Sequence, residues 1–298
     1  MSVFYTRSRG ITLAALGFAC ALAACEQESI DIVQPVDTAL VTDAGEDGVT
    51  DVVDHGRADE VESHLDELGV DLSNFERVTV PYPDGTTEEK IRVGGDILFD
   101  VDEFERITAD DAVSARQYRT NNLVSTPRTI RIIGYTGGGG YGLTSTARTA
   151  LGWAVNNYNA LNTGLTFSLS FSSSTNADMV VYRNPEESGA GGSAGFPSGG
   201  RPYKWVQLYA GLDRYNTNTQ EHVITHEIGH SVGLRHTDYF SRQSCGQNTN
   251  EGSSGVGAVL IPGTPSGYDA NSIMLACFGS NEDGEFGYYD RVALEYLY

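Results

Sequence analysis

The chain has 298 residues, of which 40% are hydrophobic and 20% charged, and its formal net charge at pH 7 is −21. A negative charge of this size disfavours binding to nucleic acid, so no nucleic-acid partner is expected. The charge is uneven, because residues 26–121 contain 26 acidic and seven basic side chains, whereas residues 122–298 contain 14 and ten. The acidity therefore belongs to the N-terminal segment.

Residues 1–24 are predicted to be an export signal. Arg7 and Arg9 give it a positive start, and an apolar stretch from residue 11 to residue 24 follows, which is too short to span a bilayer. Residues 22–25 read Leu-Ala-Ala-Cys, as in a bacterial lipobox, which predicts cleavage before Cys25 and lipid attachment to its sulfur. The alternative is ordinary secretion with cleavage at a nearby small residue. We expect an exported protein, held in the bacterial cell envelope by a lipid anchor or secreted after processing.

Residues 25–121 are interpreted as a lipid-anchored acidic tether and a prosegment. The tether, residues 26–57, has no aromatic residue and many acids, which is typical of a solvated, largely disordered segment. Apolar spacing predicts a short helix over 59–68, and two strand-like runs at 77–80 and 90–93 predict a hairpin. This ordered unit is too small to bury much core alone.

Residues 122–298 have the length of one domain. Strand and helix patterns intermix along it, so we predict an α+β fold with a mixed sheet, two long helices and a small C-terminal subdomain. A Gly- and Ser-rich stretch, residues 186–200, is expected to be a mobile surface loop. The predicted strands are 129–133, 165–171, 178–182 and 204–209, and the predicted helices are 143–161, 218–234 and 288–298.

The run HEIGHSVGLRH, residues 226–236, holds three of the six histidines of the chain. His226 and His230 are four residues apart, so they lie on one face of a helix and can reach one metal ion. Gly233 allows the helix to end and the chain to turn, which would bring His236 to the same ion. Three imidazoles with one open position are typical of a catalytic zinc site. Glu227, next to the first histidine, suits a general base.

This pattern, followed by Met274 in Ser-Ile-Met-Leu-Ala, resembles the metzincins, the zinc endopeptidase clan with a Met-turn. More narrowly, HEIGHSVGLRHTDY, a following SCG, IPGTP and SIMLAC resemble the bacterial protease B-type metallopeptidases, whose founding member is myxobacterial. The resemblance covers roughly residues 120–298, and residues 94–97 more weakly. It implies a metzincin-like fold, Zn²⁺ as cofactor, Met274 as an apolar floor beneath the ligands, and a peptide substrate extended along an edge strand at residues 205–210.

Two cysteines, Cys245 and Cys277, remain after the signal segment and Cys25. In an oxidising compartment they can pair and join the two loops that flank the zinc site. The loop-entropy model gives such a bridge a stabilising effect of about 3–4 kcal/mol. A cytosolic protein would instead have free thiols or metal ligands here, but no CxxC spacing supports that interpretation.

Three further positions lie close to the motif. His222 is four residues before His226 on the same helix face, and since three histidines already complete the ligand set, we expect it to act outside that set. Asp238 is interpreted as orienting a ligand or holding the turn. Astacin-like relatives have a tyrosine two residues after the Met-turn methionine, and here that position is Ala276.

The sequence therefore predicts a monomeric zinc endopeptidase acting on proteins or peptides, held at the membrane by lipid and made as a zymogen. One alternative is a zinc hydrolase of another substrate, such as a cell-wall peptide or an ester. Another is a surface binding lipoprotein with a structural zinc, which would need a fourth protein ligand.

Latency through a prosegment cysteine is excluded, because residues 26–121 contain none. A carboxylate can serve instead, since zinc accepts carboxylate oxygen. Asp96 is the candidate latency ligand, because the two glycines before it let the backbone approach closely. The alternative is a turn with a solvated Asp96.

Overall fold

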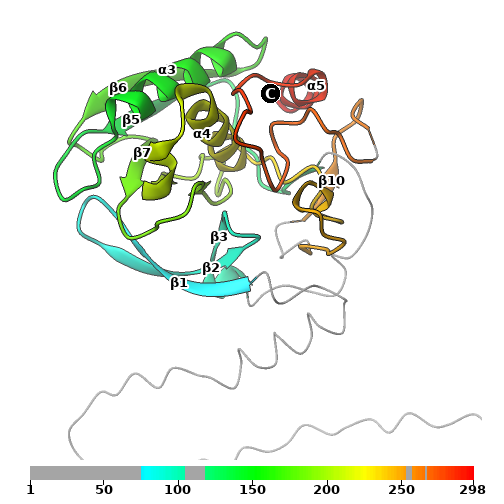
Figure 1. Cartoon of the computed structure of the whole chain (residues 1–298). Coiled ribbons are helices and arrows are strands. Elements are labelled where there is room, and N and C mark those ends of the chain that lie inside the picture. Colours follow the sequence, from blue (N-terminus) through cyan, green and yellow to red (C-terminus); the bar gives the residue numbers. More distant parts are fainter. Residues whose placement is uncertain (1–74, 105–117, 253–256, 266) are drawn as a thin grey trace, which may run out of the picture. The chain divides into compact units, whose positions relative to one another are not determined.

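The computed structural model describes residues 75–104, 118–252, 257–265 and 267–298 (Figure 1). The predicted signal segment, Cys25, the tether and the helix over residues 59–68 lie outside the described residues. Within the described part of the chain, no helix is both long enough and apolar enough to cross a membrane.

A five-stranded mixed sheet has the strand order β6-β5-β7-β9-β8 (Figure 1). Neighbouring strands run parallel, except that β8 is antiparallel to β9. Four of the strands are those predicted, and β8 lies within the predicted loop. The bounds are β5 (Arg128–Tyr135), β6 (Leu165–Ser172), β7 (Met179–Asn184), β8 (Gly192–Ser193) and β9 (Trp205–Tyr209).

Both faces of the centre of this sheet are buried, which explains its nearly continuous apolar strands. In β7, Met179 and Val181 belong to the main hydrophobic core, while Val180 and Tyr182 belong to a second cluster on the other face. Successive side chains of a strand point to opposite faces, so one strand supplies both clusters.

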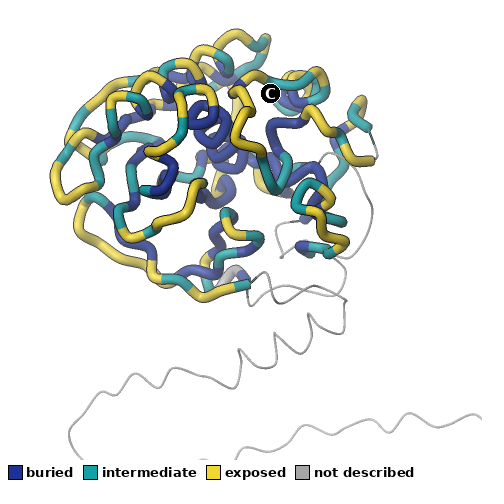
Figure 2. Tube along the Cα trace, in the orientation of Figure 1, coloured by how far each residue is buried: buried dark blue, intermediate teal, exposed yellow. Residues whose placement is uncertain are grey.

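Two helices of 15 residues, α3 (Ser145–Asn159) and α4 (Thr217–Ser231), pack on each other and contribute to the main core. Each begins at a side-chain cap, since the side chain of Thr144 accepts from the Ala147 amide and that of Asn216 from the Thr219 amide. Figure 2 shows that α4 is buried along its length. The predicted α+β fold, a mixed sheet with two long helices, is confirmed.

Residues 75–104 form a three-stranded antiparallel sheet of β1 (Phe75–Pro81), β2 (Thr87–Val93) and β3 (Ile97–Asp100), followed by the short helix α2 (Val101–Phe104). The predicted hairpin is confirmed by β1 and β2. Tyr82 stacks on Trp205 with ring centroids 4.6 Å apart, and Val80 and Leu98 join the same cluster on the second face of the five-stranded sheet. This small unit thus completes its core by sharing that face.

The C-terminal part is built from short elements and loops. A two-stranded sheet pairs β4 (Tyr118–Arg119) with β10 (Val259–Leu260), and helix α5 (Tyr288–Leu297) closes the chain. Asp290 of α5 accepts hydrogen bonds from the Ser272 hydroxyl and from the amides of Ile273 and Gly287. These bonds fix the loop that contains Met274. The 3₁₀ helices are η3 (Ala210–Arg214) and η4 (Gln243–Cys245).

The prediction of a mobile surface loop over residues 186–200 is wrong for its second half. Residues 192–197 are buried, and Gly192 and Ser193 form β8. A Cβ atom on Gly192 would lie 2.7 Å from the Gln207 carbonyl oxygen and 2.8 Å from Cγ of Glu227, so glycine serves close approach rather than flexibility here.

The prediction that residues 205–210 form the exposed edge strand is also wrong, because β8 covers β9 on that side. The edge is formed by β8 and its continuation to Ala194. A glycine-rich run gives no apolar alternation, so the strand pattern is not visible in the sequence.

Candidate active site

Helix α4 carries the first two predicted ligands on one face. The rings of His226 and His230 lie one turn apart, with centroids 4.6 Å from each other. Both side chains are buried, since they are 6% and 0% exposed. The helix therefore presents two imidazoles to the protein interior instead of to solvent.

The turn after α4 returns the third histidine to this face. Gly233 has a φ of +107°, its amide donates to the His230 carbonyl at 2.8 Å, and the Leu234 amide donates to the Gly229 carbonyl at 2.9 Å. A residue with a Cβ atom is strained at this φ, so the glycine is required. Nε2 of His236 then lies 3.2 Å from Nε2 of His230 and 3.3 Å from Nε2 of His226.

The other ring nitrogen of each histidine is held by an acceptor. Nδ1 of His226 lies 2.8 Å from the Ile273 carbonyl oxygen, and Nδ1 of His230 lies 2.8 Å from the Leu234 carbonyl oxygen. A carbonyl oxygen only accepts, so in both rings Nδ1 carries the hydrogen and Nε2 has a free lone pair.

Glu251 is the hydrogen-bond acceptor for Nδ1 of the third ring, that of His236. Its carboxylate, 0% exposed, lies 2.8 Å from Nδ1 of His236. Three Nε2 atoms therefore point at one another, and their lone pairs repel unless a cation lies among them. Imidazole nitrogens with such support are ligands for zinc and similar metal ions, so these residues fit the predicted metal.

Asp96, in the turn between β2 and β3, lies beside the same three nitrogens. Its Oδ2 is 3.0 Å from Nε2 of His236 and 3.5 Å from Nε2 of His226. Asp96 and the three histidines offer ligand atoms that all lie within 4.8 Å of one another. Burial alone would raise the pKa of Asp96, but when a proton takes the place of the metal ion among these nitrogens, the charge of His236 and the hydrogen bonds from His226 and His236 lower that pKa.

The two glycines before Asp96 have positive φ values, +65° for Gly94 and +94° for Gly95. Their carbonyls are held by side chains of the catalytic part, since Nη2 of Arg242 donates to the Gly94 carbonyl at 3.2 Å and the Tyr209 hydroxyl donates to that of Gly95 at 3.0 Å. A Cβ atom on Gly94 would lie 2.5 Å from Nη1 of Arg242. Only glycine admits this approach.

Glu227 lies beside the cluster and outside the possible ligand set. It is 2% exposed, and its Oε2 has no hydrogen-bond partner among the described residues. Burial, and then the charge of Asp96, raise the pKa of this carboxyl well above its usual value. It lines one cavity together with His226, Asp96 and Tyr209.

Met274 packs against helix α4 at Gly229, between His226 and His230. It is 1% exposed, and a Cβ atom on Gly229 would lie 2.5 Å from its sulfur, so Met274 fills the space that this glycine leaves between the two helical histidines. Its carbonyl accepts from the Thr237 amide, next to His236. The methionine thus lies where the resemblance places it.

Asp238 holds the turns around this site and orients none of the histidines. Its Oδ2 accepts from the amide and hydroxyl of Ser244, and its Oδ1 accepts from the Ala276 amide. The same two loops are joined by the Cys245–Cys277 disulfide. His222 stands apart from the ligand cluster and donates from Nδ1 to the Asp283 carbonyl at 2.9 Å.

Two residues of the site, Glu251 and Arg242, were not predicted from the sequence. Glu251 lies in a polar loop 15 residues after His236, and Arg242 has the left-handed backbone conformation at a φ of +47°. Nη1 of Arg242 donates to Oε1 of Glu251. Neither position has a spacing or a motif that marks it in the sequence, because both reach the site through the loop fold.

Three converging imidazole nitrogens beside a buried carboxylate are the arrangement of a metal-dependent hydrolase. Residues 91–298 match the model of a family described as dual-action HEIGH metallo-peptidase. The chain belongs to this family and is a metallopeptidase.

No curated protein matches the chain. Two solved structures of myroilysin are similar to part of it. One has 15% sequence identity and a TM-score of 0.39, covering 59% of this chain and 82% of that chain. The other has 14% identity and a TM-score of 0.36, covering 57% and 83%.

We predict that Glu251→Gln weakens metal binding while the fold is retained. The substitution keeps the shape of the side chain but removes the charge that supports His236, and such losses lower metal affinity by about 10–100-fold. Competition for zinc with a chromophoric chelator measures the change. Glu295→Gln, at an exposed position of α5, is the control. Equal affinities in the two variants would contradict the role of Glu251.

Proposed function

We propose that the chain is a zinc-dependent endopeptidase of the protease B type, made as an exported, lipid-anchored zymogen. The observation that carries the proposal is the convergence of Nε2 of His226, His230 and His236, with Glu227 buried beside them. In this proposal the three histidines hold the ion and Glu227 handles protons.

When bound, zinc supplies Lewis-acid polarisation and makes water acidic enough to react near neutral pH. Glu227 accepts the proton of the attacking water and then gives it to the nitrogen of the leaving amine. Its Oε2, which has no hydrogen-bond partner among the described residues, is available for that proton. Burial strengthens its interaction with the reacting groups, because it lowers the local dielectric.

A site with four protein groups also describes a structural zinc, so the fourth group needs an explanation. Asp96 comes from the prosegment, about 130 residues before the first histidine, and not from the loops that support the histidines. A structural zinc site would not explain Glu227, because its buried carboxyl lies beside the site without belonging to the possible ligand set. These two features favour a catalytic site that the prosegment closes.

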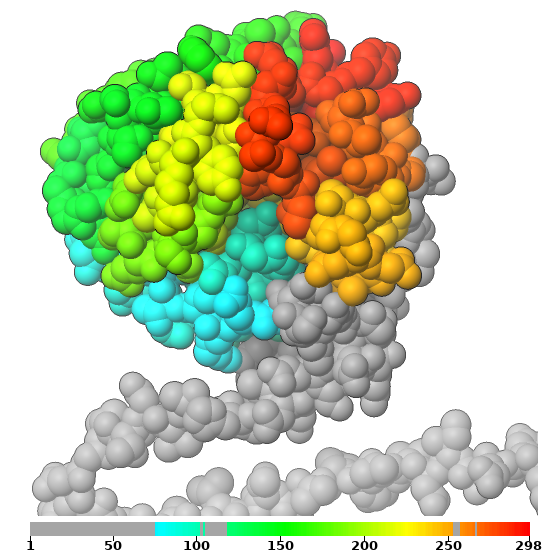
Figure 3. All heavy atoms as spheres, viewed as in Figure 1, coloured from blue at the N-terminus to red at the C-terminus, as the bar shows by residue number. Residues whose placement is uncertain are grey.

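The prosegment also occupies the sheet edge where an extended peptide would pair. The Ala194 amide donates to the Asp96 carbonyl at 3.0 Å, and the Leu98 amide donates to the Ala194 carbonyl at 2.8 Å. Figure 3 shows residues 75–104 (cyan) filling the hollow between neighbouring parts of the chain. A substrate strand adding to this edge would need the same backbone groups. Latency therefore has two components, a carboxylate at the histidines and a strand at the edge.

We predict that Glu227→Gln lowers kcat by a factor on the order of 10²–10⁴, the usual contribution of a general base. The substitution is made in protein that also carries Asp96→Ala, so that the Asp96 carboxylate does not occupy the site. Zinc content and circular dichroism are expected to be unchanged, because Glu227 is not a ligand. Glu295→Gln is again the control. Undiminished peptide hydrolysis in the Glu227 variant would remove it from the mechanism.

For latency, we predict that Asp96→Ala in the full chain raises peptidase activity without cleavage. The variant is also expected to lose zinc to a chelator faster, because a fourth ligand is gone. Asp84→Ala, in the exposed hairpin turn of the same unit, is the control. A structural zinc predicts the faster metal loss with no gain of activity, so the two readouts separate these cases.

A cut between residues 104 and 118, made at an inserted protease site, is the companion experiment. It leaves Tyr118 to Thr120 with the catalytic part, where the Arg235 amide donates to the Tyr118 carbonyl and the Thr120 amide to that of Gly233. Activation by the cut, with neither activation nor faster zinc loss in Asp96→Ala, would keep the zymogen and reject Asp96. Equal activity before and after both changes would end the zymogen proposal.

The lipid anchor is tested at Cys25. We predict that Cys25→Ser moves the protein from the membrane fraction to the soluble fraction, since a serine offers no sulfur for the lipid. Immunoblotting of the two fractions measures this. Identical fractionation of the variant and the wild-type protein would leave ordinary secretion as the explanation.

A further inference from the structure

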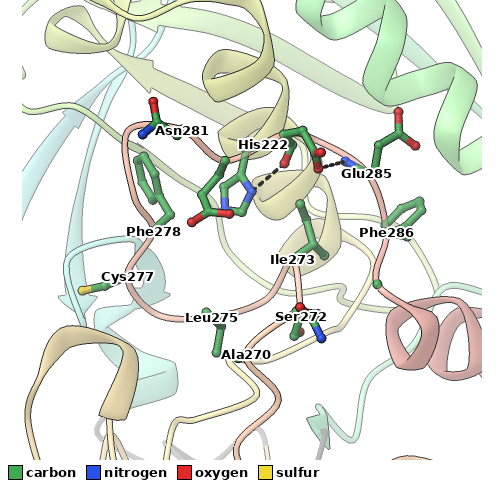
Figure 4. Close-up of a pocket in the computed structure, with 14 residues that line it drawn as sticks. His222, Ala270, Ser272, Ile273, Leu275, Cys277, Phe278, Asn281, Glu285 and Phe286 are labelled. Atoms are coloured by element: carbon green, nitrogen blue, oxygen red, sulfur yellow. Dashed lines mark hydrogen bonds between the residues drawn. The ribbon is translucent and has the colours of Figure 1, made fainter.

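A second cavity, of about 360 Å³, lies inside the loop that follows Met274 (Figure 4). His222 of α4 forms part of its wall, and residues 270–287 form the rest. Leu275, Cys277 and Phe278 line both this cavity and the cleft that holds His226 and Glu227. The two cavities are therefore separated by one short segment beside the metal ligands.

His222 has a buried hydrogen-bond acceptor that lacks a partner among the described residues. Its Nδ1 lies 2.9 Å from the Asp283 carbonyl oxygen, which only accepts, so Nδ1 carries the hydrogen and Nε2 is left with its lone pair. The residue is 5% exposed, and its Nε2 has no partner among the described residues. A buried acceptor in this state is unfavourable until a donor reaches it.

The charged residues in the wall of this cavity favour a positively charged ligand. Glu282 and Glu285 are exposed residues of the cavity wall, and neither has an ion pair with a basic side chain in the described part of the chain. No Lys or Arg lines the cavity. Of the lining residues, Ile273, Leu275, Phe278 and Phe286 are apolar, so they suit an aliphatic stem.

We infer that this cavity is a specificity pocket of the peptidase for a lysine or arginine side chain of the substrate, which donates to Nε2 of His222. The inference rests on the proposed function, because it assigns the substrate class of that same site. The stem lies on the apolar wall, and the cationic group meets the glutamates. An organic cation is favoured over a metal ion, because the described residues offer no other compact group of three ligands besides the site with Asp96.

Binding is tested first, in the full chain, so that the result does not depend on activity. The probes are the methylamides of acetyl-lysine, acetyl-arginine and acetyl-norleucine, added at millimolar concentration to protein with ¹⁵N-labelled histidine. The two cationic probes are expected to shift the Nε2 resonance of His222 saturably, and norleucine is not. His222→Phe, Glu282→Gln and Glu285→Gln each weaken binding of the cationic probes.

Equal shifts from all three probes, or none from the cations, would overturn the inference. A saturable shift with calcium or zinc but not with the amines would overturn it in favour of a metal site.

Cleavage is tested second, with peptides that differ only by Lys, Arg, norleucine or Glu at one position beside the scissile bond, in the Asp96→Ala background. The kcat/KM values for the basic peptides are expected to exceed those for norleucine by about tenfold, and Glu282→Gln is expected to reduce that ratio with zinc content unchanged. Cleavage without a basic preference would overturn the inference and leave the proposed function standing. Binding of the cations with no cleavage of any peptide would instead count against the proposed function.

Discussion

The burial of helix α4 is the constraint on which the site depends. This helix carries His222, His226, Glu227 and His230, all buried, and its apolar side chains belong to the main hydrophobic core. Buried polar groups are unfavourable unless they are hydrogen-bonded, so each histidine needs an acceptor from outside the helix. The carbonyls of Asp283, Ile273 and Leu234 supply those acceptors. The loops after the helix are thus positioned by the histidines as much as the histidines are positioned by the loops.

That arrangement fixes the rings before any ion binds. In each case Nδ1 donates a hydrogen bond to the acceptor, and Nε2 is left as the nitrogen with a free lone pair. For three rings the free nitrogens meet at one point, whereas His222 lines a separate cavity. Most polar atoms of the helix have partners within the fold, so the few without one mark places where a ligand is needed. Oε2 of Glu227 and Nε2 of His222 are two such atoms.

Local spacing made the helix and its ligands predictable from sequence. His226, His230 and Gly233 act through helix geometry and one backbone conformation, which depend on near neighbours in the chain. The strands and the two long helices were predictable for the same reason, since period and capping are local. Glu251 and Arg242 were not, because an irregular loop brings them to the site and no periodicity records such a path.

The errors over residues 186–200 and 205–210 have one physical origin. Glycine has two opposite uses, freedom of the backbone and close approach of the backbone, and a sequence does not distinguish them. At Gly192 the second use applies, since the backbone lies against Gln207 and Glu227. Reading the glycines as flexible left β8 out of the sheet. Without β8, nothing stood against the edge position that the resemblance gives to residues 205–210. At Gly94 and Gly95, where close approach to the site was inferred, the interpretation placed Asp96 correctly beside the histidines.

Residues 75–104 are held against the rest of the chain by more than the carboxylate of Asp96. Tyr82 stacks on Trp205, Val80 and Leu98 lie against the same face of the sheet, and Arg92 bonds to Glu187 and Tyr209. Burial of such apolar side chains contributes about 1.5–3 kcal/mol each, whereas the partly buried pair of Arg92 and Glu187 gains little net free energy, because both charges lose water. Apolar contacts therefore dominate the attachment. Loss of Asp96 alone frees the histidines and leaves the strand at the edge, so Asp96→Ala is expected to raise activity only in part. Full opening of the cleft requires the sheet of β1–β3 to leave the face that it shares.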